Sequence, residues 1–64
     1  MGKDLVGLRV SFVRNNIIIE GIIIRELERS VIIEIAQEDA DKIESPSILT
    51  VVHHNNYKIL HEDL

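Results

Sequence analysis

Two adjacent histidines near the end of the chain, His53 and His54, are the residues best suited to chemistry. Histidine, cysteine and carboxylate side chains are the usual protein ligands of zinc. The segment around the pair has the pattern of a β-strand, in which neighbouring side chains point to opposite faces. A metal would therefore use one of these rings with His61 and a carboxylate, and no spacing here matches a known ligand pattern. We expect one histidine half-buried and the other solvated, with no metal and no other cofactor.

The acidic run 38–44 invites comparison with a calcium-binding loop. It lacks the glycine and the regular series of oxygen ligands of an EF-hand, so a solvated loop or one turn of helix is the simpler interpretation. Nucleophilic catalysis needs a nucleophile beside an oriented base. The serines and Thr50 lie in no elbow or glycine-rich motif. We therefore expect no catalytic residues and no enzyme activity.

Four arginines are the candidates for a nucleic-acid-binding face: Arg9, Arg14, Arg25 and Arg29. A hairpin centred on Asn15-Asn16 would place Arg14 beside the turn and bring Arg9 and Arg25 towards its other end. However, the net charge is −4 and aromatic residues make up only 3% of the chain. Both values are unfavourable for a protein that relies on counterion release and base stacking. A nucleic-acid- or ribosome-associated module is therefore the alternative function.

The segment 17–25 carries more apolar side chains than one face of a strand can bury, because six of its nine residues are isoleucine. Its second face would then meet another sheet, a second copy of the chain or a protein partner. In the other interpretation, a bulge or bend at Gly21 changes the inward set from Ile17 and Ile19 to Ile22 and Ile24, and a closed barrel buries them all. Both interpretations stay open. The candidate partner-binding residues are Ile18, Ile19, Ile22 and Ile23.

The length of 64 residues predicts one domain, 1–64, with a small core. Domains of this size bury only about 60% of the surface that the unfolded chain exposes. The absence of cysteine excludes disulfides as a source of stability and fits a reducing compartment. The longest apolar stretch, 17–24, is too short for a membrane helix, and no signal peptide is apparent. We expect a cytoplasmic protein without membrane contact, stabilised by dense packing and by formation of a homodimer.

Alternating apolar residues, punctuated by two Asn-Asn pairs, predict five strands at 8–14, 17–25, 31–36, 48–53 and 57–60. A helix over 17–29 is the competing interpretation. Runs of isoleucine disfavour it, because β-branched side chains lose χ1 freedom in a helix. Short strands, tight turns and one longer acidic connection predict an all-β fold, a small five-stranded SH3-like barrel or roll.

Two parts of the chain resemble known families. The opening 6–12 (VGLRVSF), followed by 20–23 (EGII), is similar to the start of SH3-like barrels of the KOW type, in which one glycine precedes the first strand and another bends the next hairpin. The stretches 30–35 (SVIIEI) and 50–60 (TVVHHNNYKIL) resemble the YkvS-like family of short bacterial proteins, found mainly in Firmicutes and their phages. The first resemblance implies a fold whose members often contact ribosomal RNA or transcription proteins. The second implies no site.

The leading hypothesis is a non-enzymatic interaction module, a homodimer that binds a protein partner through an isoleucine-rich face and an acidic rim. In a phage or mobile element, such a module would inhibit or redirect a host factor. A nucleic-acid-binding module that uses the four arginines is the second hypothesis, and a metal-dependent enzyme built on the histidines is the third.

Overall fold

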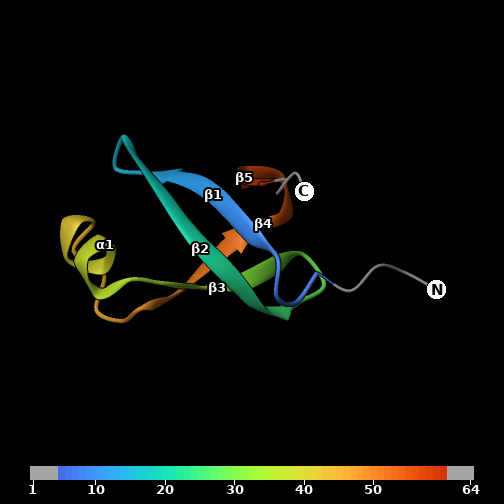
Figure 1. The fold of residues 1–64 in the computed structure, drawn as a ribbon. Coiled ribbons are helices and arrows are strands. Elements are labelled where there is room, and N and C mark those ends of the chain that lie inside the picture. Colours follow the sequence, from blue (N-terminus) through green and yellow to red (C-terminus); the bar gives the residue numbers. More distant parts are fainter. Residues whose placement is uncertain (1–4, 61–64) are drawn as a thin grey trace.

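The computed structural model describes residues 5–60, which form a five-stranded antiparallel sheet with one short helix (Figure 1). In chain order the elements are β1 (Arg9–Arg14), β2 (Ile17–Glu26), β3 (Ser30–Ile35), α1 (Gln37–Lys42), β4 (Leu49–His53), the 3₁₀ turn η1 (His54–Asn56) and β5 (Tyr57–Ile59). The five predicted strands are confirmed, and each observed end lies within one residue of the prediction. The acidic segment forms a helix, which decides between the two alternatives for it.

The strand order is β4-β3-β2-β1-β5, so β4 and β5 are the two ends of the sheet. The expectation of a closed barrel is therefore corrected: hydrogen bonds between strands do not close this sheet. In Figure 1 the β1–β2 hairpin runs diagonally in front of β3 and β4, with α1 at one end of the sheet. The strong twist lets one sheet enclose a core without closing on itself. Within residues 5–60, no helix is long and apolar enough to cross a membrane.

The first Asn-Asn pair forms the turn that the sequence predicts. Asn15 and Asn16 have φ values of 55° and 64°, as a two-residue hairpin turn with two left-handed residues requires. Arg14 and Ile17 consequently pair across the hairpin. The second pair behaves differently, because Asn55 lies inside η1, where the His53 side chain accepts a hydrogen bond from its backbone N–H. The chain therefore turns between β4 and β5 by a 3₁₀ turn and not by a second hairpin of the same kind.

The core contains one face of the sheet and the inner side of the helical segment. Its buried side chains come from four strands and from the helix with its C-terminal cap: Val10, Phe12, Ile19, Ile23, Val31, Ile33, Ile35, Ala40, Ile43 and Val52. The Asn15 side-chain amide donates to the Ile43 carbonyl at 3.3 Å. This bond fastens the hairpin turn to the C-terminal end of α1, so the helix covers one end of the core.

The expected bulge or bend at Gly21 is wrong in position. Gly21 pairs regularly with Val10 on one side and Ile35 on the other. The irregularity lies three residues later, where Ile23 pairs with Ile33 but Arg25 pairs with Ile32, leaving Ile24 as the extra residue. The alternation of β2 therefore runs unbroken through Gly21, and the proposed change of inward set to Ile22 and Ile24 does not occur.

Candidate interaction surface

The isoleucines of β2 divide between the core and the outer face of the sheet. Ile19 and Ile23 have exposed fractions of 1% and 0%, whereas Ile18, Ile22 and Ile24 have 71%, 37% and 40%. Of the four candidate partner-binding residues, the structure therefore leaves Ile18 and Ile22 available for contact. Ile19 and Ile23 are packed in the core, because side chains of β2 alternate regularly between the two faces from Ile17 to Ile23.

Side chains of the next two strands extend this apolar surface. Ile32 of β3 pairs with Val51 of β4 and also lies opposite the irregularity that contains Ile24. Val51 and Leu49 point away from the core, with 56% and 44% of their surfaces exposed. We call the surface formed by Ile22, Ile24, Ile32, Leu49 and Val51 the outer patch. Val13 and Ile18, which pair near the hairpin turn, form a smaller apolar pair elsewhere on the same face.

Acidic side chains border the outer patch at Ile22. A shallow hollow of about 400 Å³ there is lined by Ile22 together with Glu20, Glu34 and Asp39. Arg9 also lines it, and its guanidinium lies 3.8 Å from the Glu20 carboxylate. Both side chains of that ion pair are more than half exposed, so the pair adds little stability. Three carboxylates thus lie beside Ile22 on this face.

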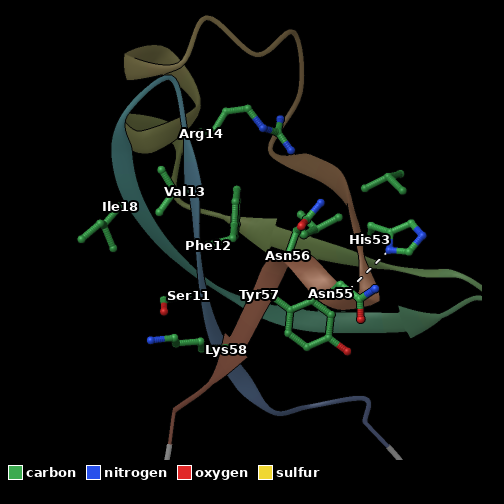
Figure 2. A pocket seen from close by; sticks show the side chains of 12 residues that line it. Ser11, Phe12, Val13, Arg14, Ile18, His53, Asn55, Asn56, Tyr57 and Lys58 are labelled. Carbon is green, nitrogen blue, oxygen red and sulfur yellow. Dashed lines mark hydrogen bonds between the residues drawn. The ribbon is translucent and has the colours of Figure 1, made fainter.

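A larger hollow of about 510 Å³ lies between β1 and β4, with η1 and β5 at its base (Figure 2). We call it the β1–β4 hollow. Phe12 and Arg14 of β1 line it, with Val52 of β4, and Tyr57 and Lys58 of β5. The Arg14 Nη1 donates to Thr50 Oγ1 at 3.3 Å, and its Cζ lies 5.5 Å from the centre of the Phe12 ring. Arg14 thus spans the part of the sheet that strand pairing leaves open.

Comparison with known proteins gives one result. A family model described as "Uncharacterized protein conserved in bacteria (DUF2187)" matches residues 3–60. The chain belongs to the DUF2187 family. No curated protein and no solved structure matches it. Membership in DUF2187 brings no activity, and the resemblances to KOW-type barrels and YkvS-like proteins stay predictions.

The four arginines of this DUF2187 protein do not share one face. Arg9 lies on the outer face beside Glu20, whereas Arg14 points to the inner side, towards Thr50. Arg25 is near the far end of β2 from the hairpin turn, roughly 25 Å from Arg14 at about 3.3 Å of rise per residue. Arg29 lies in the β2–β3 loop, where its carbonyl accepts the His54 backbone N–H. The hairpin places Arg14 beside the turn and Arg9 and Arg25 towards its other end, as predicted, but the four arginines do not form one basic face.

The two histidines of the DUF2187 protein have different environments, as the sequence predicts. His53 is exposed and His54 is half-buried. The His54 Nε2 lies 3.1 Å from the Leu27 carbonyl, and Nδ1 lies 3.0 Å from the Tyr57 hydroxyl. Since a carbonyl only accepts, Nε2 donates, and in the neutral ring Nδ1 accepts from Tyr57. Within residues 5–60, no cluster of three histidine, cysteine or acidic residues has the geometry to hold a metal. His61, the third expected ligand, lies outside the described residues.

Tyr57, the chain's single tyrosine, gives a direct test of this arrangement. Burial raises its pKa above the ordinary value of 10.0, and the Glu26 carboxylate raises it further. The folded protein therefore holds the phenol proton at a pH where the unfolded chain releases it. The resulting stability is fully present below pH 10.0 and is lost as the pH rises through the folded pKa.

An absorbance titration should show ionisation of Tyr57 at higher pH in the folded protein than in denaturant. Glu26→Gln should lower the folded midpoint, and equal midpoints in both states would contradict the assignment.

Sequence reasoning missed Ile24, Ile32, Leu49 and Val51 as surface residues. The available signal was the segment 49–53, in which Thr50 and Val52 alternate with Leu49 and Val51. Because three of these four are apolar, periodicity alone does not say which pair is buried. The phase depends on packing against distant strands, which bury Thr50 and Val52 and leave Leu49 and Val51 exposed.

Proposed function

We propose that the protein is a non-enzymatic interaction module, an SH3-like roll that forms a homodimer and binds a protein partner through the outer patch. The single observation that carries this proposal is the position of five apolar side chains on three neighbouring strands, on the face of the sheet opposite the core, with Glu34 between Ile22 and Leu49. Contiguous exposed apolar surfaces of this kind mark interaction sites more often than scattered ones do. The meander of β1 to β4, and the 3₁₀ turn after which β5 returns to pair with β1, support the roll.

The strength of the expected contact follows from the exposure of the outer patch. Ile22, Ile24, Leu49 and Val51 each keep between about a third and somewhat more than half of their surface in water. Completing the burial of these side chains in two protomers would contribute roughly 5–10 kcal/mol, at about 1.5–3 kcal/mol per fully buried side chain. Association costs are of the same order, about 4–15 kcal/mol. The difference is at most about 6 kcal/mol, which corresponds to a Kd of tens of micromolar or weaker. We therefore expect a symmetric dimer that forms at high micromolar concentration and dissociates on dilution.

Sedimentation over the micromolar range should show the dimer fraction rise with concentration, and the melting temperature should rise with it. Ile24→Asp should give a folded monomer, because it places a carboxylate in the outer patch beside Ile32. Ile59→Asp is the matched control: the same change at an isoleucine of nearly equal exposure, 39% against 40%, which lies on β5 outside the outer patch and lines neither hollow. It should leave the dimer intact. A monomer at high micromolar concentration with a constant melting temperature would refute the dimer.

The protein partner is tested with the same two variants. A protein captured from lysate by the wild type should be lost with Ile24→Asp and kept with Ile59→Asp. Capture that both variants abolish, or that neither affects, would remove the outer patch as the binding surface. Captured RNA that nuclease releases would favour the nucleic-acid-binding alternative.

A further inference from the structure

The β1–β4 hollow differs in charge from the rest of the chain. The protein carries 11 acidic and 7 basic side chains, for a net charge of −4. None of the residues that line this hollow is acidic, whereas Arg14, Lys58 and His53 are among them. Within residues 5–60, no carboxylate forms an ion pair with Arg14 or Lys58. The hollow is therefore a locally basic site on an acidic protein.

Arg14 is held in a fixed position at this site. One of its N–H groups donates to Thr50, and its guanidinium lies 5.5 Å from the centre of the Phe12 ring, within the range of a cation–π contact. An arginine side chain has five N–H donors in a planar fork that matches a carboxylate. The donors that Thr50 does not use have no acceptor among residues 5–60. The Arg14 side chain is thus already ordered before a ligand binds. It can donate to a carboxylate without the entropy cost of first being immobilised.

The edge of β4 offers main-chain groups beside the same hollow. The bonds from Ile35 N–H to Ile48 and from His54 N–H to Arg29 flank the β3–β4 ladder, at 2.8 and 3.1 Å. In an antiparallel ladder, alternate residues direct their main-chain groups to opposite sides. The N–H and C=O of Val51, and the N–H of His53, therefore point away from β3. No strand within residues 5–60 pairs with that edge, so an extended segment can add to it.

We infer that the β1–β4 hollow binds an extended segment of a partner protein in which acidic and apolar side chains alternate. The segment pairs with the β4 edge at Val51, places a carboxylate on Arg14, and rests an apolar side chain against the exposed apolar lining of the hollow. The inference rests on the proposed function in taking a protein as partner. It adds a second surface with different chemistry, which meets the outer patch at Val51.

Other occupants fit the hollow less well. A nucleic acid presents a regular series of phosphates. Arg14 and Lys58 are the two permanently charged basic side chains in the hollow, and two are too few to bind such a series. Pairing of the β4 edges of two copies would bring no acceptor to Arg14, because segment 49–53 contains no carboxylate. The chain's own acidic run is committed elsewhere: it forms α1, whose Ala40 is buried in the core. The chemistry therefore points to an acidic segment from another protein.

The test uses a short labelled peptide in which glutamate alternates with valine, and measures fluorescence anisotropy near physiological salt. A peptide with glutamine in place of glutamate, and a labelled single-stranded oligonucleotide, are run beside it. Arg14→Gln should weaken binding of the acidic peptide roughly tenfold to a hundredfold, the range for a hydrogen bond to a charged group. Arg25→Gln is the matched control, since it removes an exposed arginine outside the hollow, and it should leave binding unchanged.

Lys58→Gln is a second variant, because Arg14 also contacts Thr50 and Phe12 and its loss can disturb the fold. Loss of this exposed lysine should reduce the affinity for the acidic peptide several-fold, with no change in melting temperature. In ¹⁵N spectra, the peptide should shift the Val51 and His53 amides. The inference would be overturned if the acidic peptide did not bind, if the glutamine peptide bound equally well, or if the oligonucleotide bound more tightly. Chemical-shift changes confined to the Ile22 and Ile24 amides would also overturn it. Because Ile24→Asp tests the dimer separately, failure here is distinguishable from failure of the proposed function.

Discussion

Replacing Gly21 with alanine is expected to destabilise the protein severely. A Cβ atom at this position would lie 2.5 Å from Ile33 Cγ2, 2.6 Å from the Glu34 carbonyl oxygen and 3.0 Å from Ile35 Cγ2. Side-chain rotation cannot relieve the second contact, because the Glu34 oxygen belongs to the backbone of β3. The strand must move, and Ile33 and Ile35 must move within a closely packed core.

The cost of such overpacking is about 1–3 kcal/mol and occasionally more. For a domain of this size, each kcal/mol lowers the melting temperature by about 4–8 °C. We therefore expect Gly21→Ala to melt about 10–20 °C below the wild type or to lose its cooperative transition. Thermal denaturation followed by circular dichroism measures this directly.

Gly7→Ala is the control for the general effect of replacing a glycine. Gly7 has a φ of 96°, and no atom lies within 4 Å of the position that its Cβ would occupy. Its replacement adds backbone strain of about 1–2 kcal/mol without a steric clash. Gly21→Val should be worse than Gly21→Ala, whereas Gly7→Asn should be milder than Gly7→Ala, because asparagine tolerates positive φ. A Gly21→Ala protein as stable as the wild type would show that β2 and β3 do not approach as closely as described.

Local signals predicted the strands because each strand and its turn are decided within a few residues. Asn15 and Asn16 adopt the left-handed conformation that such a pair favours, and the alternation in β1 and β3 matches their buried residues. These features depend on φ preferences and on a period of two, and both are visible in the sequence.

The phase of β2 was not predictable in the same way, because both of its faces are apolar. The choice depends on contacts between strands: Gly21 faces the crowded inner side, where Ile33 and Ile35 leave no room for a side chain. A glycine inside a strand fits a bulge and a close approach equally well, and only the partner strand distinguishes them. The open sheet is also decided at a distance, since β5 is short and pairs with β1 instead of β4. The β1–β4 hollow follows from that choice of partner.

Ile23→Asp and Ile18→Asp are expected to have opposite effects on folding, although both place the same charge on the same strand. Ile23 is fully buried, and its main chain is also bonded on both sides: Gly7 N–H donates to its carbonyl at 2.7 Å, and its own N–H donates to Leu8 at 3.0 Å. The strand therefore cannot rotate this position out to solvent. Ile18 has 71% of its surface exposed, so its aspartate remains hydrated.

An aspartate at position 23 would be buried among apolar side chains, without a partner for its charge. The penalty is several kcal/mol for the charge, with the lost burial of isoleucine in addition. Small domains have a total stability of about 5–15 kcal/mol, so Ile23→Asp should be unfolded at room temperature. Ile23→Val removes only one methylene and should cost about 0.5–1.5 kcal/mol. Ile18→Asp should remain within about 0.5 kcal/mol of the wild type, as surface substitutions usually do.

Urea denaturation followed by circular dichroism separates these outcomes at a protein concentration low enough to keep every variant monomeric. At that concentration the comparison reports the fold of one chain and not the dimer. A cooperative transition for Ile23→Asp near that of the wild type would place position 23 outside the core. Unfolding of Ile18→Asp would place position 18 inside it. Either result would reverse the phase of β2, and the outer patch would then have to be redrawn around the opposite set of isoleucines.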